Sequence, residues 1–343
     1  MRTGVILGDV PASLSPREHL DGLLRQVEAA QRNGVSYLTI GQHFLYGDLR
    51  WLQPIPTLAR LAAELDDGVT LATMIVQVPL HHPVALAEEL ATLDIMTRGR
   101  LVVGVGAGYR ADEFTAFGVD FGQRFAMLEE GLALIRRLWT EDEVSFHGRY
   151  WTLDSARPHI RPWQQPHPPL WLGAMTEIGV RRSARLADGW PVTPETKIPD
   201  LVRLMSLYED ERERLGRPQV RHPLRREIVP APTTDDAFRR FELMAKERLI
   251  AYARRQLATR DAGELESSFR ELAAKEAFLG TPAECIRQIR ELAAIVPIDP
   301  IIVRAQWPGM PADQVVEYLD ELGEEVIPAM RQIESVPRVV RGE

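Results

Sequence analysis

Short apolar runs alternate with segments of helical spacing along most of the chain, and this alternation restricts the fold more than any other feature of the sequence. The runs have the length of buried strands, whereas the segments between them repeat apolar residues every three or four positions. A strand–helix–strand order makes the strands parallel and covers both faces of their sheet with helices. Apolar runs begin near residues 3, 35, 69, 101, 170, 189, 225 and 300. Eight such units predict an α/β fold, the (β/α)8 or TIM barrel.

Two regions interrupt the alternation and are predicted to be insertions in one domain that covers residues 1–343. The first, at about 107–168, follows the fourth strand and contains a predicted hairpin between Val144 and Leu153 and a proline-rich loop. The second, at about 233–278, precedes the eighth strand and is highly charged with helical spacing. We interpret that charge as a solvated face rather than as an anion site.

Charge and cysteine content narrow the class of partner and the compartment. The net charge of −8 argues against a general nucleic-acid or anionic-membrane partner, so we expect a small-molecule substrate. The single cysteine, Cys285, permits no internal disulfide, and the N-terminus builds no signal-peptide core. No apolar stretch approaches the length of a membrane span. These features predict a cytoplasmic protein.

A glycine-rich loop after the fourth predicted strand is the strongest candidate site. Gly104, Gly106 and Gly108 stand at every second position and remove side chains where a flat ligand could lie against the backbone. The spacing differs from the dinucleotide fingerprint, because Tyr109 stands where the third glycine would be. The alternative interpretation is that these glycines only let a strand pack closely inside a barrel.

Other candidates follow neighbouring strands, because a barrel carries its site at the carboxyl ends of its strands. His43 follows the second strand and could donate a hydrogen bond or a proton to a bound ring, although a lone loop histidine is more often structural. Met74 and Ile75 lie in the third predicted strand. Aromatic residues that could line an apolar pocket, or simply pack in the core, are Phe44, Tyr46, Trp51 and Tyr109.

The loop after the fifth strand turns into a helix and offers a possible phosphate site. Free backbone N–H groups, the Thr176 hydroxyl and Arg181 could together hold one phosphate. The alternative is that Thr176 only caps its helix. His81 and His82 are adjacent and point in opposite directions in an extended segment, so they cannot readily share a metal. We predict no metal site.

Several motifs together resemble the bacterial luciferase-like flavin-dependent oxidoreductases, across nearly the whole chain. They are Leu93-Asp94 with Thr97-Arg98-Gly99-Arg100, Gly104 to Gly108 with Glu113-Phe114 and Phe117-Gly118, Leu138-Trp139-Thr140 with Val144, Phe146 and Gly148, and Trp171-Leu172-Gly173 with Ala187-Asp188-Gly189-Trp190. The resemblance implies a (β/α)8 barrel enzyme, a homodimer, and a reduced flavin, usually FMN supplied by a separate flavin reductase, or in a large branch of the family the deazaflavin coenzyme. It also implies a monooxygenase that uses O2 to oxidise a small organic substrate.

The resemblance also assigns residues to the cofactor. It places Thr176, Ile178, Gly179, Val180 and Arg181 on a phosphate loop and Gly106, Ala107 and Gly108 beside the ring of the cofactor. The position where the family often carries a non-proline cis peptide bond matches Met74-Ile75.

This chain departs from the family pattern at three positions, which keeps alternatives open. Gln42 stands at one histidine of the proton-handling pair, which leaves Gln42 and His43 as the catalytic candidates. Ala107 replaces a phosphate-contacting arginine, and Gly108 stands near a glutamate of some deazaflavin dehydrogenases. The alternatives to the monooxygenase are hydride transfer with a deazaflavin coenzyme and a flavin-binding protein without catalysis.

Overall fold

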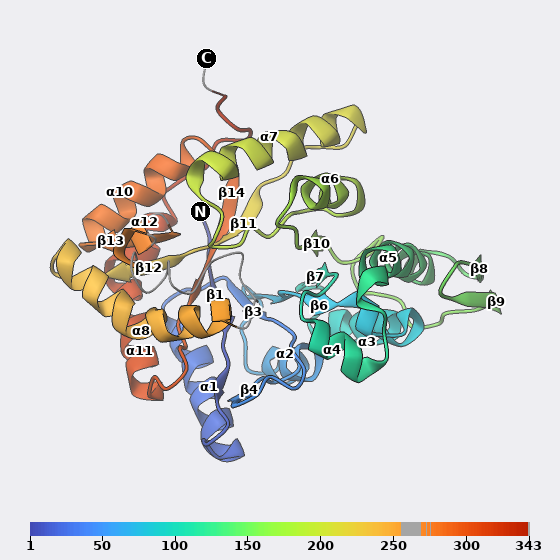
Figure 1. Ribbon diagram of the computed structural model, residues 1–343, viewed down its shortest axis with the longest axis horizontal. Coiled ribbons are helices and arrows are strands. Elements are labelled where there is room, and N and C mark those ends of the chain that lie inside the picture. Colours follow the sequence, from blue (N-terminus) through green and yellow to red (C-terminus); the bar gives the residue numbers. More distant parts are fainter. Residues whose placement is uncertain (255–268, 272, 275, 342–343) are drawn as a thin grey trace.

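The structure, a computed structural model, describes residues 1–254, 269–271, 273–274 and 276–341, and helices surround its central strands (Figure 1). The main sheet has the strand order β10-β7-β5-β3-β1-β14-β11, with β6 paired to β7. Neighbouring strands along this order are parallel, as the alternation predicts. The strands are β1 Thr3–Leu7, β3 Tyr37–Ile40, β5 Thr70–Thr73, β6 Val76–Gln77, β7 Leu101–Gly106, β10 Leu170–Leu172, β11 His222–Arg225 and β14 Ile298–Arg304.

Two isolated bridges join the ends of this sheet. Trp171 of β10 pairs with Gly189, and Val192 pairs with Leu224 of β11, both in parallel. A backbone hydrogen bond to each carbonyl supports the bridges, at 3.0 Å for Gly189 and 2.9 Å for Val192. The segment 189–192 is therefore the sixth of the eight predicted strands, and the predicted TIM barrel is confirmed.

Helices form the connections between the strands and cover the outer face of the barrel (Figure 1). Capping boxes at Ser15 with Glu18 and at Thr281 with Glu284 begin α1 and α10. Within the described residues, no helix is both long and apolar enough to cross a membrane. The helices are α1 Pro16–Arg32, α2 Pro54–Ala62, α3 Pro83–Met96, α4 Ala111–Phe117, α5 Arg124–Thr140, α6 Glu177–Leu186, α7 Ile198–Arg214, α8 Thr234–Arg254, α10 Pro282–Ala293, α11 Ala312–Glu321 and α12 Ile327–Met330.

Several short elements stand outside the main sheet. After α5, the hairpin of β8 Val144–His147 and β9 Thr152–Ala156 projects away from the barrel (Figure 1). After β11, strand β12 Glu227–Pro230 is followed by α8 and then by β13 Ala277–Gly280. A short antiparallel pair, β2 Val10–Pro11 and β4 Leu49–Arg50, joins the loops after β1 and β3.

The end of the second predicted insertion differs from the helical expectation. Ala277 and Phe278 belong to β13, where both are buried and pair in parallel with β12. Helix α8 confirms helical structure earlier in the same segment. The remaining part of that prediction, residues 255–268, 272 and 275, lies outside the described residues.

Side chains of alternate strand residues build two layers of core. A small cluster packs together from the strands of the sheet and consists of Ile6, Tyr37, Ala72, Val102, Trp171 and Ile302. Their neighbours along the strands, such as Val5, Leu71 and Val103, belong to the larger cluster shared with the helices. Because successive strand residues point to opposite faces, the first cluster fills the barrel and the second lies between the barrel and its helices.

The glycines of β7 let this strand approach the segment that follows β5. A Cβ atom on Gly104 would lie 2.0 Å from the Thr73 carbonyl oxygen, and one on Gly106 would lie 2.7 Å from Ile75 Cδ1. The Thr73 hydroxyl donates to the Gly104 carbonyl at 2.7 Å and accepts from the Gly104 N–H at 2.8 Å. At these two positions, the structure therefore shows close strand packing, the alternative interpretation of the glycine spacing.

We expect Gly104→Ala to lower the free energy of unfolding by about 3 kcal/mol, because the new methyl group would overlap backbone that cannot move aside. Urea denaturation of the variant and the native chain measures the difference. Gly68→Ala is the matched control, since in the described residues no heavy atom beyond its two chain neighbours lies within 4 Å of its added Cβ. A loss for Gly104→Ala no larger than that of the control would contradict the packing argument.

Candidate functional site

His43 lies at the carboxyl end of β3, between two side chains from the region after β7. Its Nδ1 is 3.1 Å from Glu113 Oε1, and its Nε2 is 3.1 Å from the Tyr109 hydroxyl. Glu113 Oε1 also accepts the Phe44 backbone N–H at 2.8 Å and Arg110 Nη1 at 3.3 Å. An ionised carboxylate oxygen can only accept hydrogen bonds, so His43 Nδ1 must donate to it. The imidazole proton therefore resides on Nδ1. His43 Nε2 is then the acceptor for the Tyr109 O–H.

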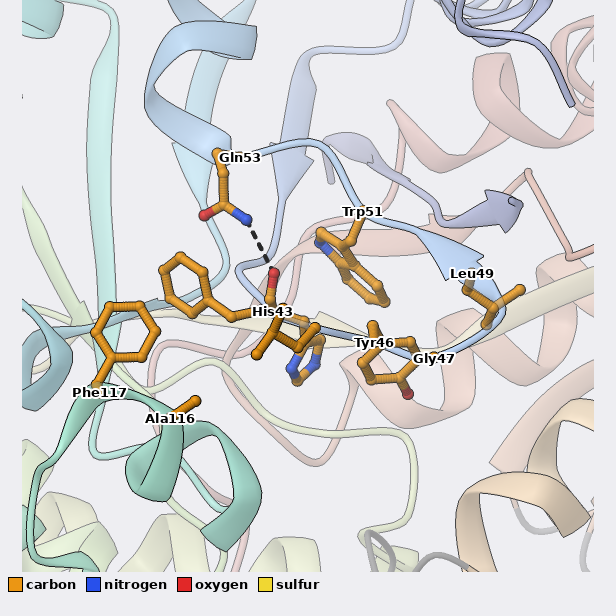
Figure 2. A pocket seen from close by; sticks show the side chains of 10 residues that line it. His43, Tyr46, Gly47, Leu49, Trp51, Gln53, Ala116 and Phe117 are labelled. Carbon is orange, nitrogen blue, oxygen red and sulfur yellow. Dashed lines mark hydrogen bonds between the residues drawn. The ribbon is translucent and has the colours of Figure 1, made fainter. Parts of the chain in front are cut away.

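A cavity of about 680 Å³ opens beside His43, between the loop after β3 and the end of α4 (Figure 2). Rings dominate its wall: the centroids of Phe44 and Phe117 are 4.6 Å apart, and those of Tyr46 and Trp51 are 5.2 Å apart. Its volume is in the range of small-molecule sites. The lining residues are His43, Phe44, Leu45, Tyr46, Gly47, Leu49, Trp51, Gln53, Ala116 and Phe117.

Three of the four aromatic residues predicted for a substrate pocket, Phe44, Tyr46 and Trp51, line this cavity. The fourth, Tyr109, is not among the residues that line the cavity, but its hydroxyl contacts His43, which is. No Asp, Glu, Lys or Arg belongs to the described lining. The wall therefore suits an uncharged, flat molecule better than a charged one.

Gln42 lies behind the cavity and ties the loop after β3 to β6. Its Oε1 accepts the Gln77 backbone N–H at 3.0 Å and lies 3.0 Å from His81 Nε2. Its Nε2 donates to Gln53 Oε1 at 3.2 Å, and Gln53 in turn donates to the His43 carbonyl at 2.9 Å (Figure 2). Burial lowers the pKa of His81, which favours the neutral imidazole in this network. The geometry makes Gln42 a side chain that holds the loop in place.

The backbone around the glycine loop meets β6 closely. The Met74-Ile75 peptide bond is cis, as the resemblance implies. Gly108 has a φ of 77°, and a Cβ there would lie 2.4 Å from Gln77 Oε1. That oxygen is buried and has no hydrogen-bond partner among the residues that the structure describes. Ala107, the third residue assigned to this wall, is buried.

The start of α6 shows which parts of the predicted phosphate loop can meet a ligand. The Thr176 hydroxyl accepts the Gly179 N–H at 3.2 Å and so caps the helix. Arg181 lies on the side that faces α7, with Nη1 3.7 Å from a Glu211 carboxylate oxygen. The Val180 side chain is buried, whereas Ile178 is 73% exposed. The backbone at the helix start, rather than the Arg181 guanidinium, is therefore the part suited to an anion.

A second buried ion pair lies across the rim, where β1 and β14 end. Arg304 Nη1 is 3.0 Å from Asp9 Oδ1, and Arg248 Nη2 of α8 is 3.2 Å from the same oxygen. Although burial alone would raise the pKa of the Asp9 carboxyl, Arg248 and Arg304 hold it below its ordinary value. Burial lowers the pKa of Arg304 to about 9. In the described residues, no group of three or more potential metal-ligating side chains comes together.

The sequence interpretation assigned no role to Glu113, Arg110, Asp9 or Arg304. Glu113 stands in a motif quoted for the family resemblance, and its charge so close to the glycine loop was the available signal. Nothing in the sequence showed that it would contact His43, because 70 residues separate them. Asp9 follows β1 and Arg304 is the last residue of β14, and only the fold makes these positions meaningful.

A parallel barrel with a ligand-sized cavity where its strands end defines a barrel enzyme. The family model for luciferase-like monooxygenases matches residues 1–297 of this chain. The chain therefore belongs to the luciferase-like monooxygenase family, and the resemblance of its motifs to that family is confirmed.

Solved structures share the fold over nearly the whole chain. The monooxygenase RslO1 from Streptomyces bottropensis aligns with a TM-score of 0.81 at 26% identity, over 96% of this chain and 100% of that one. The oxygenating constituent of 3,6-diketocamphane monooxygenase from Pseudomonas putida, in complex with FMN, aligns with a TM-score of 0.81 at 19% identity, over 98% and 99%. At the lower identity the likeness shows the fold alone.

The curated relatives include proteins other than monooxygenases. An uncharacterized protein of Mycobacterium tuberculosis is 36% identical over 174 residues, which span 50% of this chain and 61% of that relative. An F420-dependent glucose-6-phosphate dehydrogenase of Intrasporangium calvum is 26% identical over 344 residues, 92% of this chain and 95% of that relative. This chain is thus similar both to a monooxygenase and to a dehydrogenase that depends on the deazaflavin coenzyme F420.

We expect Gln42→Met to lower the free energy of unfolding by about 2 kcal/mol, because the thioether leaves the buried Gln77 N–H and His81 Nε2 without their acceptor. Chemical denaturation at neutral pH measures the loss. The exposed Gln332→Met is the control, with an expected change below about 0.5 kcal/mol. Equal stability of the two variants would show that the Gln42 network does not hold the loop.

Proposed function

We propose that this protein is a flavin-dependent monooxygenase that uses reduced FMN and O2 to oxidise a small, uncharged organic substrate. The observation that carries the proposal is the cavity of about 680 Å³, whose aromatic wall excludes ionised side chains and includes His43. Family membership and the likeness to the monooxygenase RslO1 support the same chemistry. A flavin reductase as electron donor and a homodimeric assembly are part of this proposal.

The residues at the rim fit a flat ring with a phosphate tail. The buried Gln77 Oε1 beside Gly108 accepts no hydrogen bond from the described part of the chain, which suits an N–H group at the edge of a ring. Met74-Ile75 and the loop from Gly106 to Gly108, which pack against each other, would together border the ring, and the start of α6 would receive the phosphate. When bound, the reduced flavin supplies the electrons that activate O2.

The side chains of this chain would then perform three tasks. Phe44, Phe117 and Trp51 would exclude water from the reacting atoms, which strengthens every polar interaction there. Gln42 would hold the loop after β3 at a constant distance from β6. His43, with its Nδ1 proton directed to Glu113, would keep a fixed tautomer for proton transfer.

Hydride transfer with the deazaflavin coenzyme is the second candidate, and the Intrasporangium calvum relative favours it. The two candidates differ in the role of oxygen, which takes no part in hydride transfer. They also differ in the tail of the cofactor, because the acidic tail of the deazaflavin coenzyme would require more cationic contacts than the single phosphate of FMN.

We expect the purified protein to bind reduced FMN about tenfold more tightly than the reduced deazaflavin coenzyme, a difference of roughly 1.4 kcal/mol. Anaerobic titrations followed by protein fluorescence measure both affinities. The reverse preference would support the dehydrogenase, and binding of neither cofactor would overturn the proposal. Tight FMN binding without any oxygen-dependent turnover would support a flavin-binding protein without catalysis.

We expect Ile178→Glu to weaken FMN binding about tenfold and to leave riboflavin binding unchanged, because the new carboxylate would repel only the ligand that has a phosphate. Ile178 is 73% exposed, so the substitution does not disturb the core. Leu243→Glu on α8, at a position 87% exposed, is the control. Parallel losses for FMN and riboflavin would place the phosphate away from the start of α6.

A further inference from the structure

Three titratable side chains form one hydrogen-bonded row from the surface inward. Tyr109 is 41% exposed, His43 is 9% exposed and Glu113 is 1% exposed. Each neighbouring pair is 3.1 Å apart, from the Tyr109 hydroxyl to His43 Nε2 and from His43 Nδ1 to Glu113 Oε1. We propose that Tyr109, rather than His43, exchanges a proton with the bound ligand, while His43 and Glu113 act behind it.

The hydrogen bonds around Glu113 determine the direction of the row. Its Oε1 accepts from Phe44 N–H, from Arg110 and from His43 Nδ1, so His43 Nε2 faces Tyr109 as an acceptor. Both imidazole nitrogens are therefore engaged within the protein. For His43 to reach a ligand directly, it would have to release Tyr109 or Glu113, whereas Tyr109 is the most exposed of the three side chains.

Proton transfer along this row conserves charge at every step. In the acid direction, the N–H bond at Nε2 of the His43 imidazolium breaks and its proton moves to the Tyr109 oxygen. The original Tyr109 O–H bond breaks at the same time, and that proton bonds to an oxygen atom of the ligand. Tyr109 stays neutral, His43 becomes a neutral imidazole that keeps its Nδ1 proton, and the reverse sequence removes a proton from the ligand.

Glu113 acts as a positioning residue, because it touches His43 and has almost no exposure. Its second oxygen, Oε2, is buried and has no hydrogen-bond partner in the described residues, so the orientation of the carboxylate depends on the three donors at Oε1. Arg110, one of the three donors, has two further neighbours, Asp112 and the Tyr46 ring. Arg110 is ion-paired with Asp112 as well as with Glu113, and its guanidinium lies 4.7 Å from the Tyr46 ring centroid.

His43 thus faces Glu113 and Tyr109 directly, with Arg110 and Tyr46 next to them. The negative charge of Glu113 would stabilise the imidazolium that the acid direction requires, as an orienting carboxylate does in other enzymes. Arg110 moderates that effect, because its own charge lies against the same oxygen.

The proposal rests on the proposed FMN function, and the oxidation of bound reduced FMN tests it without a known substrate. Anionic reduced FMN, O2 and one proton give oxidised FMN and H2O2, so the row would deliver that single proton to the oxygen being reduced. We expect Tyr109→Phe to slow this oxidation about 100-fold and to remove its dependence on pH, with the affinity for FMN unchanged. Stopped-flow absorbance over a range of pH measures the rate.

Two further variants complete the experiment. Glu113→Gln keeps an acceptor for the Phe44 N–H but lacks the charge, so we expect a shifted pH profile and a rate about tenfold lower. Tyr150→Phe is the control. Tyr150 lies between β8 and β9, its hydroxyl donates to Gln123, and the variant should keep the native rate. A native rate and native pH profile for Tyr109→Phe would overturn the proposal.

A measurement without cofactor separates failure of this proposal from failure of the proposed function. Nitrogen NMR of labelled histidine reports which ring nitrogen of His43 carries the proton, and we expect Nδ1 in the native chain. Loss of that preference in Glu113→Ala, which removes the acceptor of the Nδ1 proton, would support the row even if FMN did not bind. A proton on Nε2 in the native chain would overturn the row whatever the protein binds.

Discussion

The close contact between β7 and the segment after β5 is the constraint on which the site depends. Gly104 and Gly106 lack the side chains that would separate these strands, and the Thr73 hydroxyl bonds both backbone groups of Gly104. Because β6 pairs with the end of β7, Gln77 comes beside Gly108. A wider spacing at Gly104 would therefore displace the loop after β7 from the network of the loop after β3.

Hydrogen bonds of Gln77 and Gln42 connect β6 to the loop that carries His43 beside the cavity. Gln42 bonds to the Gln77 backbone and, through Gln53, to the carbonyl of His43. The position of His43 thus depends on amide side chains that have no charge to titrate. The Gln42 amide uses both its oxygen and its nitrogen in hydrogen bonds, and such a fixed support is what a proton-transferring side chain requires.

Two buried carboxylates on the rim are each bonded to arginine side chains. Glu113 is bonded by Arg110 near the cavity, and Asp9 is bonded by Arg304 and Arg248 where β1 and β14 end. Removing one partner from such a pair leaves an ion in low dielectric, which costs more than the pair contributes. The aromatic cavity lies beside the first of these places and contains neither carboxylate in its wall.

The alternation of apolar runs and helical segments determined the barrel, because parallel strands with helical connections have few ways to bury both faces. It also determined which loops share a rim, and so where His43, Met74 and Tyr109 would lie. Only the tertiary structure decided what those loops do to one another. Glu113 contacts His43 across 70 residues of sequence, and Arg181 faces α7 rather than the start of its own helix. Periodicity records which face of an element is buried, whereas the partner on that face depends on how separate elements pack in space.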